Sequence, residues 1–465
     1  MEEKELPKIR SMQELQAEFD KVFLMRDRGV LPLICATVVA NQLDNDPVWL
    51  LVISPPSGGK TELIESLEKV SLRGKPLAFP ISDLTVNTFA SGQKKMGKET
   101  SLLHKMSVGS IMTFKDFTSM ISKNKDAQAE IMGQLREVYD QHYVKRTGTG
   151  DDIVWKGKVG AIAGCTEIIY EKNEEFSVMG DRFIMYSMTQ PERMEVLQRV
   201  MDSAKDKGDG FKKKKMYLKE CMKSYLEWVF DNQENLPFEI SDKNQKDLLQ
   251  IVNFVTIVAS GMVIDKRRGL VEFVPSKTMP MRMAKQIIGI GEAFVLMNKL
   301  TLAGDEALEK GNASTVVGEM QGELTEEQIG VLYKIMFDTI PIKRRTALKA
   351  LAQYKQGVGT AGLATSIGYQ TVVVSGWLAQ LNALGICTRE KRTGPKGDKW
   401  ILKEEYRNIM VRFEKIETVD ASLDVDEVGD LDDVWNEVEQ VGREKEMDSL
   451  DFEMPHIESD IDKLW

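Results

Sequence analysis

The chain has 465 residues, 42% of them hydrophobic and 29% charged, so it is long enough for about two to four domains with cores of their own. No apolar run approaches the roughly 20 residues that a membrane-spanning helix needs, and the N-terminus lacks the basic and apolar regions of a signal peptide. Four cysteines and three histidines are too scattered for a zinc site, a disulfide framework or a cluster of catalytic imidazoles. We expect a cytoplasmic protein with reduced thiols and no membrane partner.

Charge is spread unevenly along the chain. The net charge is −10, but residues 415–465 hold 18 acidic and 4 basic side chains, which leaves the other 414 residues with about +4. A mildly basic body with an acidic tail differs from a uniformly acidic enzyme. Such a body can bind polyanions, while its tail repels or mimics them.

Residues 1–46 are predicted to be a mainly helical segment, and residues 47–190 alternate strands with helices. This alternation is typical of a three-layer α/β nucleotide-binding fold. The strands of this core are predicted at Val48–Ile53, Leu77–Ile81, Ser110–Phe114, Val159–Ala163 and Phe183–Met188.

The first predicted strand runs into a Pro/Gly turn at residues 54–59, which an amphipathic segment follows. Strand, turn and helix in this order are the context of a phosphate-binding loop. Lys60 would reach the β and γ oxygens of ATP, and the Thr61 hydroxyl would hold Mg²⁺. Ser54 stands where the full GxxxxGK[ST] motif has its first glycine. The residues whose backbone N–H groups would surround the phosphates are Ser57, Gly58 and Gly59.

A second chemical element follows the predicted strand Ser110–Phe114. Asp116 is the one good candidate for an acidic residue at a strand end, and Lys115 precedes it where a second acid would make a pair. Asp116 would either bind the magnesium ion or polarise the attacking water. The alternative is an aspartate that only caps the next helix.

Two further positions complete the candidate catalytic set. Thr166 ends the predicted strand at 159 and could lie near the γ-phosphate. Arg182 precedes the last predicted strand, a placement that suits an arginine finger acting across a subunit boundary. A surface salt bridge would explain Arg182 equally well.

The ordered motifs Ser-Gly-Gly-Lys-Thr, Phe-Lys-Asp-Phe-Thr, Gly-Cys-Thr-Glu and Gly-Asp-Arg-Phe resemble an AAA+ ATPase core. The spacing is most similar to the branch of minichromosome-maintenance helicases and their relatives in phages and mobile elements. The resemblance implies that Lys60 and Thr61 form Walker A, Asp116 Walker B, Thr166 sensor 1 and Arg182 the finger. Residues 191–310 have few strand signals and several apolar helical repeats, so they are predicted to be an all-α lid or bundle. The resemblance implies that its Arg282 is a nucleotide-binding sensor 2 and that the chain forms a homo-oligomeric ring. A lone acid at Walker B, and threonine where sensor 1 usually has asparagine, depart from the pattern of fast hydrolysis.

After a linker at 311–323, residues 324–410 are predicted to form a separate winged helix-turn-helix. A capping box begins the module, and Gly368 supplies the turn between two helices. Two strands joined by a basic Gly/Pro hairpin follow. The residues predicted to contact DNA are Gln370, Thr371 and Ser375 on the recognition helix and Arg389, Lys391, Arg392, Lys396 and Lys399 on the wing. A winged helix that binds protein is the alternative.

The tail, residues 411–465, has few aromatic residues and many acids, so it is predicted to be disordered. It ends in an acidic segment that closes on Leu464 and Trp465, which resembles the protein-docking tips of bacterial single-strand-binding proteins. The tail would then bind a replication partner, and the alternative is a solubilising appendage.

The sequence therefore predicts an ATP- and Mg²⁺-dependent AAA+ ATPase that binds DNA and acts in phage or mobile-element replication, as a helicase or an initiator. The alternative is a non-motor DNA-binding protein switched by ATP, such as a loader, partition factor or regulator with weak hydrolysis. A nucleotide-binding defence or signalling protein without a DNA role is a third class.

Overall fold

The computed structural model describes residues 7–85, 88–89, 94–95, 98–99, 101–146, 152–172, 179–203, 210–265, 270–274, 276–311, 313, 317, 322–391 and 397–422. Met1–Asp420 is one compact unit, and Ala421–Trp465 is a second. The domain boundaries drawn from the sequence within the first unit stay predictions.

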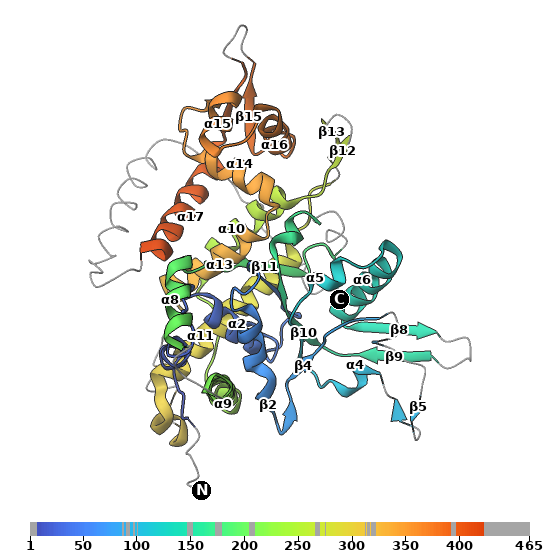
Figure 1. Ribbon diagram of the computed structural model, residues 1–465, viewed down its shortest axis with the longest axis vertical. Coiled ribbons are helices and arrows are strands. Elements are labelled where there is room, and N and C mark those ends of the chain that lie inside the picture. Colours follow the sequence, from blue (N-terminus) through green and yellow to red (C-terminus); the bar gives the residue numbers. More distant parts are fainter. Residues whose placement is uncertain are drawn as a thin grey trace. The chain divides into compact units, whose positions relative to one another are not determined.

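A five-stranded parallel sheet lies at the centre of the first unit (Figure 1). Leu51 on the first predicted strand is opposite Met185 on one side and Ala163 on the other. The five predicted strands are confirmed, with small shifts at their ends. In spatial order the strands are β11 (Phe183–Ser187), β1 (Trp49–Ile53), β10 (Val159–Cys165), β7 (Ser110–Phe114) and β4 (Ala78–Pro80).

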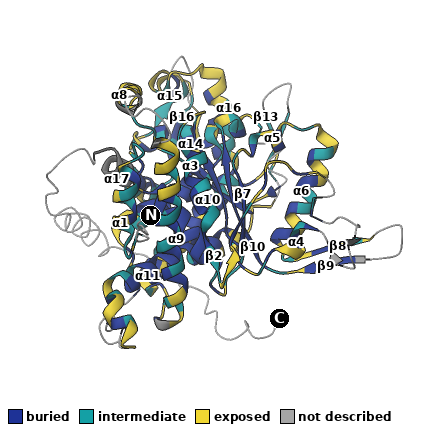
Figure 2. Cartoon of the chain, turned by 60° about the horizontal axis from the view of Figure 1, so that its bottom comes forward, coloured by how far each residue is buried: buried dark blue, intermediate teal, exposed yellow. Residues whose placement is uncertain are grey.

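Both faces of the sheet are buried, which explains why its strands are continuous apolar runs. Leu50 and Val52 of β1 belong to the hydrophobic cluster that includes α2 (Val30–Ala40). Trp49 and Leu51 alternate with them and belong to the cluster on the other face, which includes α6 (Lys125–Tyr139). The strands are accordingly coloured as buried in Figure 2, and helices enclose them as the three-layer prediction requires.

Short elements connect these layers. Ser11 caps the first helix with a capping box: its side chain accepts the Glu14 N–H, and the Glu14 side chain accepts the Ser11 N–H. The connecting elements are α1 (Met12–Asp20), α3 (Lys60–Glu65), η1 (Ser66–Lys69), β2 (Ser71–Leu72), β3 (Lys75–Pro76), β5 (Lys94–Lys95), β6 (Lys98–Glu99), α4 (Leu102–Lys105), α5 (Thr118–Ile121), β8 (His142–Arg146), β9 (Asp152–Lys156) and η2 (Glu167–Tyr170).

The region predicted as an all-α lid is mostly helical, but it also contains an antiparallel hairpin, β12 (Val263–Asp265) with β13 (Leu270–Phe273). The longest helix of this region, α11 (Met281–Glu309), packs against α2, so this helix belongs to the core that covers the sheet. That helix is the one described helix long and apolar enough to cross a membrane, and most of its apolar window is buried inside the protein. The helices are α8 (Arg193–Ser203), α9 (Gly210–Asn232), η4 (Gln233–Asn235), α10 (Asp242–Ala259) and α11 (Met281–Glu309).

The C-terminal module begins at the predicted capping box, in which Thr325 and Gln328 satisfy each other's backbone N–H groups. Gly368 ends one helix with φ at 72°, the left-handed conformation that the predicted turn needs. Three short strands pair in the order β14-β16-β15. The elements are α13 (Glu326–Asp338), α14 (Ile342–Ala352), β14 (Val358–Gly359), α15 (Thr360–Ile367), α16 (Thr371–Ala383), β15 (Cys387–Glu390), β16 (Lys399–Leu402) and α17 (Glu404–Ser422).

The predicted start of the disordered tail, residue 411, is wrong. Helix α17 continues to Ser422, and its Phe413 is buried. The Phe413 ring stacks on Phe337 of α13 with 3.8 Å between centroids, and this contact holds the helix against the module. Residues 423–465, with the predicted docking tip, lie outside the described residues.

Close packing of α2 on β10 depends on one glycine. Asn41, directly after α2, donates from its side-chain amide to the carbonyls of Thr37 and Val48, and it accepts from the Val48 N–H. A Cβ added to Gly160 of β10 would lie 2.4 Å from Nδ2 of Asn41 and 2.6 Å from Cδ1 of Ile111. Asn41 cannot move aside without losing these hydrogen bonds.

We expect Gly160→Ala to lower the free energy of unfolding by about 1–3 kcal/mol, because the added methyl overpacks a buried site. The matched change Gly133→Ala lies in helix α6, where the new methyl would meet only Nη2 of Arg136 at 3.9 Å. That variant should gain about 0.5–1 kcal/mol, since alanine favours the helix. Urea unfolding of both variants measures the difference, and equal stabilities would contradict the close contact of α2 with β10.

Candidate functional site

The predicted P-loop, residues 54–59, follows the carboxyl end of β1 and leads directly into α3 at Lys60. Ser57 and Gly59 have positive φ angles of 64° and 84°, so the loop turns sharply and exposes backbone at this point. A Cβ on Gly59 would meet no atom within 4 Å, so the loop is open on that side. On Gly58 it would lie 2.7 Å from Oγ of Ser54, so the other side of the loop is closely packed.

Lys60 is buried, with 7% of its surface exposed, and its Nζ donates to the carbonyls of Ser54 and Pro55 at 3.4 and 3.2 Å. Burial lowers the pKa of Lys60, while the nearby carboxylates of Asp116 and Glu62 act in the opposite direction. No carboxylate in the described part of the chain forms an ion pair with Lys60. A buried ammonium without an ionic partner is costly, and a bound phosphate would supply the missing charge.

Asp116 lies just beyond β7, at the same edge of the sheet, and is exposed. Its Oδ1 accepts the backbone N–H of Thr118 at 2.9 Å, which is the capping contact considered as its alternative role. The preceding Lys115 turns away and pairs with Glu65 and Glu68. A Cβ on Gly164 of β10 would lie 2.8 Å from the Lys115 carbonyl, so this glycine lets the Asp116 loop approach β10.

Thr118 joins Asp116 to Thr166, and it is a residue that the sequence reasoning missed. Its hydroxyl lies 3.2 Å from the Thr166 hydroxyl and accepts the Thr166 N–H at 3.3 Å. The signal was its position two residues after Asp116, where a capping aspartate receives a backbone N–H. The carboxyl edge therefore brings together Lys60, Asp116, Thr118 and Thr166.

Arg182 lies at the opposite edge of the sheet. It precedes Phe183, which is in register with Trp49, the first residue of β1. The P-loop follows the last residue of β1, and a five-residue strand spans about 16 Å. In this chain Nη2 of Arg182 binds Oδ2 of Asp140 at 2.6 Å, and Arg182 is 8% exposed. The salt bridge considered as its alternative role is therefore present.

Arg282 lies beside Arg182 and not at the P-loop of its own chain. Its Nη1 pairs with Oδ1 of Asp181 at 3.2 Å. Burial raises the pKa of Tyr139, and the carboxylates of Asp46 and Asp181 raise it further, whereas the two arginines lower it. The Tyr139 hydroxyl and Nε of Arg182 are buried without a hydrogen-bond partner among the described residues.

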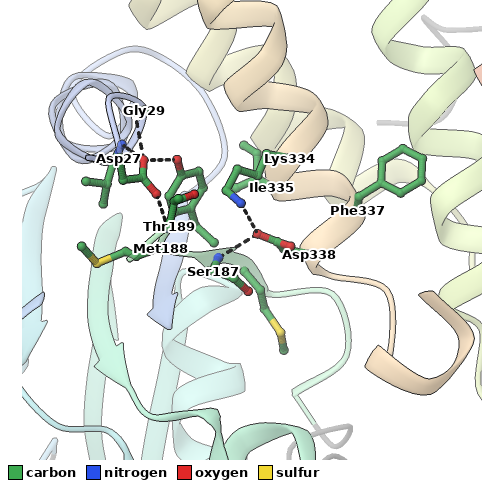
Figure 3. Close-up of polar contacts among 12 residues, drawn as sticks. Asp27, Gly29, Ser187, Met188, Thr189, Lys334, Ile335, Phe337 and Asp338 are labelled. Carbon is green, nitrogen blue, oxygen red and sulfur yellow. Dashed lines mark hydrogen bonds and ion pairs between the residues drawn. The ribbon is translucent and has the colours of Figure 1, made fainter. Parts of the chain in front are cut away.

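The side of the P-loop away from Asp116 is formed by Gln190, a second residue that the sequence reasoning missed. A Cβ on Gly58 would lie 2.8 Å from Oε1 of Gln190. The backbone leading to it is fixed, because Met188 N–H donates to the Ile53 carbonyl and Thr189 N–H to Asp27 (Figure 3). A motif search does not find Gln190, since only the strand order places it next to the P-loop.

The residues predicted to contact DNA lie on the C-terminal module. Gln370, Thr371 and Ser375 are exposed at the start of α16, and Lys391 is exposed after β15. Two of the cations are paired within the module: Arg389 with Asp398 at 2.6 Å and Lys399 with Glu390 at 3.8 Å. The other two predicted residues, Arg392 and Lys396, lie outside the described residues.

Within the described residues no cluster of three or more His, Cys, Asp or Glu side chains could hold a metal ion by itself. A magnesium ion at the P-loop would instead be shared between Thr61, Asp116 and the nucleotide, as such ions usually are. The four cysteines are buried and unpaired, as predicted, and burial raises the pKa of Cys165 to about 11.

No protein-family model and no curated protein matches the chain. Among the solved structures that are similar is one described as SCCmec type IV Cch, an active helicase, at 11% sequence identity with a TM-score of 0.34. That similarity covers 86% of this chain and 71% of the other. Likeness at this level assigns neither a fold nor an activity.

We expect Lys60→Ala to abolish ATP binding, because it removes the buried ammonium that faces the phosphates. Lys115→Ala is the matched control: its ammonium pairs with Glu65 and Glu68, and its removal should leave the affinity unchanged. Titration with a fluorescent ATP analogue measures both, and thermal unfolding confirms that the variants fold. Undiminished binding by Lys60→Ala would place the nucleotide elsewhere.

Proposed function

We propose that the chain is an ATPase that binds Mg²⁺-ATP at the carboxyl edge of its sheet and couples this to DNA binding by its C-terminal module. The observation that carries the proposal is the buried ammonium of Lys60, which has no ionic partner among the described residues and lies next to an open glycine turn. A triphosphate fits this combination, because it brings the charge that Lys60 lacks and accepts hydrogen bonds from the turn.

The chemistry assigned to each residue follows from its position. Backbone N–H groups of Ser57, Gly58 and Gly59 would hold the phosphates, and Thr61 would bind Mg²⁺. Asp116 would bind the same ion or orient water, and Thr118 keeps Thr166 beside it. Hydrolysis then needs in-line attack on the γ-phosphate by a water held at this edge.

Arg182 and Arg282 support action on the nucleotide of a neighbouring subunit in a homo-oligomer. Both lie at the amino edge, across the sheet from their own P-loop. A second subunit that presents its P-loop to this edge would offer phosphate to both guanidinium groups. Asp140 and Asp181 hold them until then.

DNA is the partner proposed for the C-terminal module as a winged helix. Residues 342–402 contain ten lysines and arginines and two acidic residues, a net charge of +8. The polar start of α16 is exposed and can reach base edges, as a recognition helix does. This charge favours DNA over a protein partner, because phosphate contacts dominate non-specific affinity.

One observation favours the alternative of a switch with slow hydrolysis. Asp116 is the lone acid at its strand end, and one of its oxygens already accepts the Thr118 N–H. A loader, partition factor or regulator needs ATP binding more than rapid turnover. The proposed role in phage or mobile-element replication rests on the motif resemblance alone, and the proposed place in the cytoplasm rests on the scattered cysteines and the absence of signal-peptide features in the sequence.

Asp116→Asn should retain ATP binding and lose most turnover. The asparagine Oδ1 can still accept the Thr118 N–H, but the negative charge toward the metal or water is gone. Comparison of ATP affinity with the steady-state rate of phosphate release tests this. Full turnover by the variant would show that another acid serves the metal.

Arg182→Ala should impair hydrolysis in the assembled protein, and mixing it with Lys60→Ala should restore part of the activity. The mixture contains interfaces that combine an intact P-loop with an intact arginine from the other subunit. Arg73→Ala, at an exposed arginine of the β2–β3 turn, is the control and should keep the rate. Lack of any rescue would contradict action across a subunit boundary.

Lys391→Ala should weaken DNA binding and flatten the plot of log affinity against log salt by about 0.9, because one duplex phosphate is no longer neutralised by the protein. Lys310→Ala removes an equal charge at an exposed position outside the module and should leave the slope unchanged. DNA titrations of both variants at several salt concentrations measure the slopes. Equal slopes for the two variants would remove Lys391 from the DNA surface.

A further inference from the structure

The strand β11 is an edge strand of the parallel sheet, and side chains from distant parts of the chain satisfy its outward N–H groups. Met185 N–H donates to the Thr339 hydroxyl at 3.1 Å, and Ser187 N–H donates to Oδ2 of Asp338 at 2.7 Å. Asp338 is the last residue of α13 (Figure 3), and Thr339 is the C-cap that follows it. The C-terminal module therefore covers the edge of the sheet in place of a sixth strand.

The N-terminal segment fixes the same strand just beyond its end. Asp27 is buried, and its Oδ1 accepts from the N–H groups of Gly29 and Val30 and from the Tyr186 hydroxyl. Its Oδ2 accepts the Thr189 N–H at 2.7 Å. Figure 3 shows Asp27 between the start of α2 and the end of β11. This single carboxylate thus sets where residues 189 and 190 leave the sheet.

Helix α13 and β11 leave no free space around Gly29. A Cβ at this position would lie 2.6 Å from the Tyr186 hydroxyl and 2.7 Å from Cγ2 of Val331, which belongs to α13. A displacement of α13 would therefore reach Tyr186 and the N-terminal segment directly. The N-terminal segment, β11 and α13 are in close contact at this glycine.

The acceptor Asp338 is itself held by a buried arginine. Asp338 pairs with Arg345 of α14, and both side chains are 9% exposed. The Arg345 guanidinium also lies over the ring of Tyr170 at 5.8 Å, and the Tyr170 hydroxyl is 2.5 Å from Oγ of Ser187. Tyr170 ends η2, which begins one residue after Thr166. The corner between α13 and α14 thus contacts two of the strand ends that form the nucleotide site.

The neighbouring Arg344 connects this corner to the proposed recognition helix. Its Nη1 donates to the carbonyls of Val258 and Ser260 at 2.8 and 2.6 Å, and its Nε donates to Oε1 of Gln380 on α16 at 3.0 Å. Burial lowers the pKa of Arg344 to about 10. Helix α14 is therefore linked to α16 through Arg344 and, through Arg345 and Asp338, to β11 of the sheet.

We propose that Gln190 is a further residue of the nucleotide site and that Asp27, Asp338 and Arg345 position it. The corner of α13 and α14 is then a structural part of the ATP site, and movement of the C-terminal module changes ATP affinity. The proposal rests on the proposed ATP binding at Lys60. Gln190 packs its Oε1 beside Gly58 while its Nε2 donates to the Met188 carbonyl at 3.2 Å, so it supports the loop from its closely packed side, and the other three act through β11.

The test measures the affinity of the full chain for a fluorescent ATP analogue. Gln190→Ala and Asp338→Ala should each weaken binding about tenfold, the size expected when a hydrogen bond to a charged or buried group is removed. Asp338→Asn should recover part of the affinity, since its amide oxygen can still accept the Ser187 N–H. Recovery of affinity by this variant distinguishes positioning of β11 from a general loss of stability.

Arg407→Lys is the matched control for the buried arginine pair. Arg407 is 4% exposed and donates to carbonyls of Ala352 and Lys355 within the C-terminal module, so its change lowers stability at a distance from β11. Its ATP affinity should equal that of the unaltered chain, whereas Arg345→Lys should bind more weakly. Thr339→Val, which removes the acceptor for Met185 N–H at nearly constant volume, replaces Asp338→Ala should that variant not fold.

The outcomes separate this inference from the proposal on which it rests. An unaltered chain that does not bind the analogue, or a Lys60→Ala variant that binds it equally well, overturns both. Loss of binding in Lys60→Ala together with normal binding in Gln190→Ala, Asp338→Ala and Thr339→Val overturns the positioning role alone.

Discussion

The burial of β1 on both faces and between two parallel neighbours is the constraint on which the rest of the structure depends. Its five residues are fully enclosed, with β11 on one side and β10 on the other. Because every strand runs in the same direction, the loops after β1, β7, β10 and β11 must all emerge at one edge. Lys60, Asp116, Thr166 and Gln190 meet there although as many as 130 residues separate them in the chain.

The same parallel arrangement separates the two halves of the proposed catalytic machinery. The groups proposed to bind phosphate and metal lie at the carboxyl edge, whereas Arg182 and Arg282 lie at the amino edge. On the proposed function, one chain would hold two incomplete sites, and stacking of identical chains would complete both. The Tyr139 hydroxyl and Nε of Arg182, which have no hydrogen-bond partner within the described ranges, lie at the edge that a neighbour would cover.

Local patterns in the sequence sufficed for the strands, the turn between β1 and α3 and the capping box at Thr325, because each depends on neighbouring residues. The same holds for the turn at Gly368, where only a left-handed residue fits. Thr118, Asp27 and Asp338 escaped prediction because their roles depend on partners 48, 162 and 151 residues away. The start of the tail was misplaced for a similar reason: the isolated apolar residue Phe413 has its stacking partner in α13. Long-range pairing of this kind produces no periodicity in the sequence.

The pairing of Arg182 with Asp140 bears on how readily subunits would associate. Asp140 is 47% exposed on its side chain, whereas Arg182 is 10% exposed. Water can replace the arginine at the exposed carboxylate at little cost, but the buried guanidinium needs an anion at all times. Under the proposed function, exchange of Asp140 for the γ-phosphate of a neighbour would keep Arg182 neutralised throughout, and a neighbour without ATP would offer no such exchange. On this physical ground, assembly of subunits through the amino edge would depend on bound ATP.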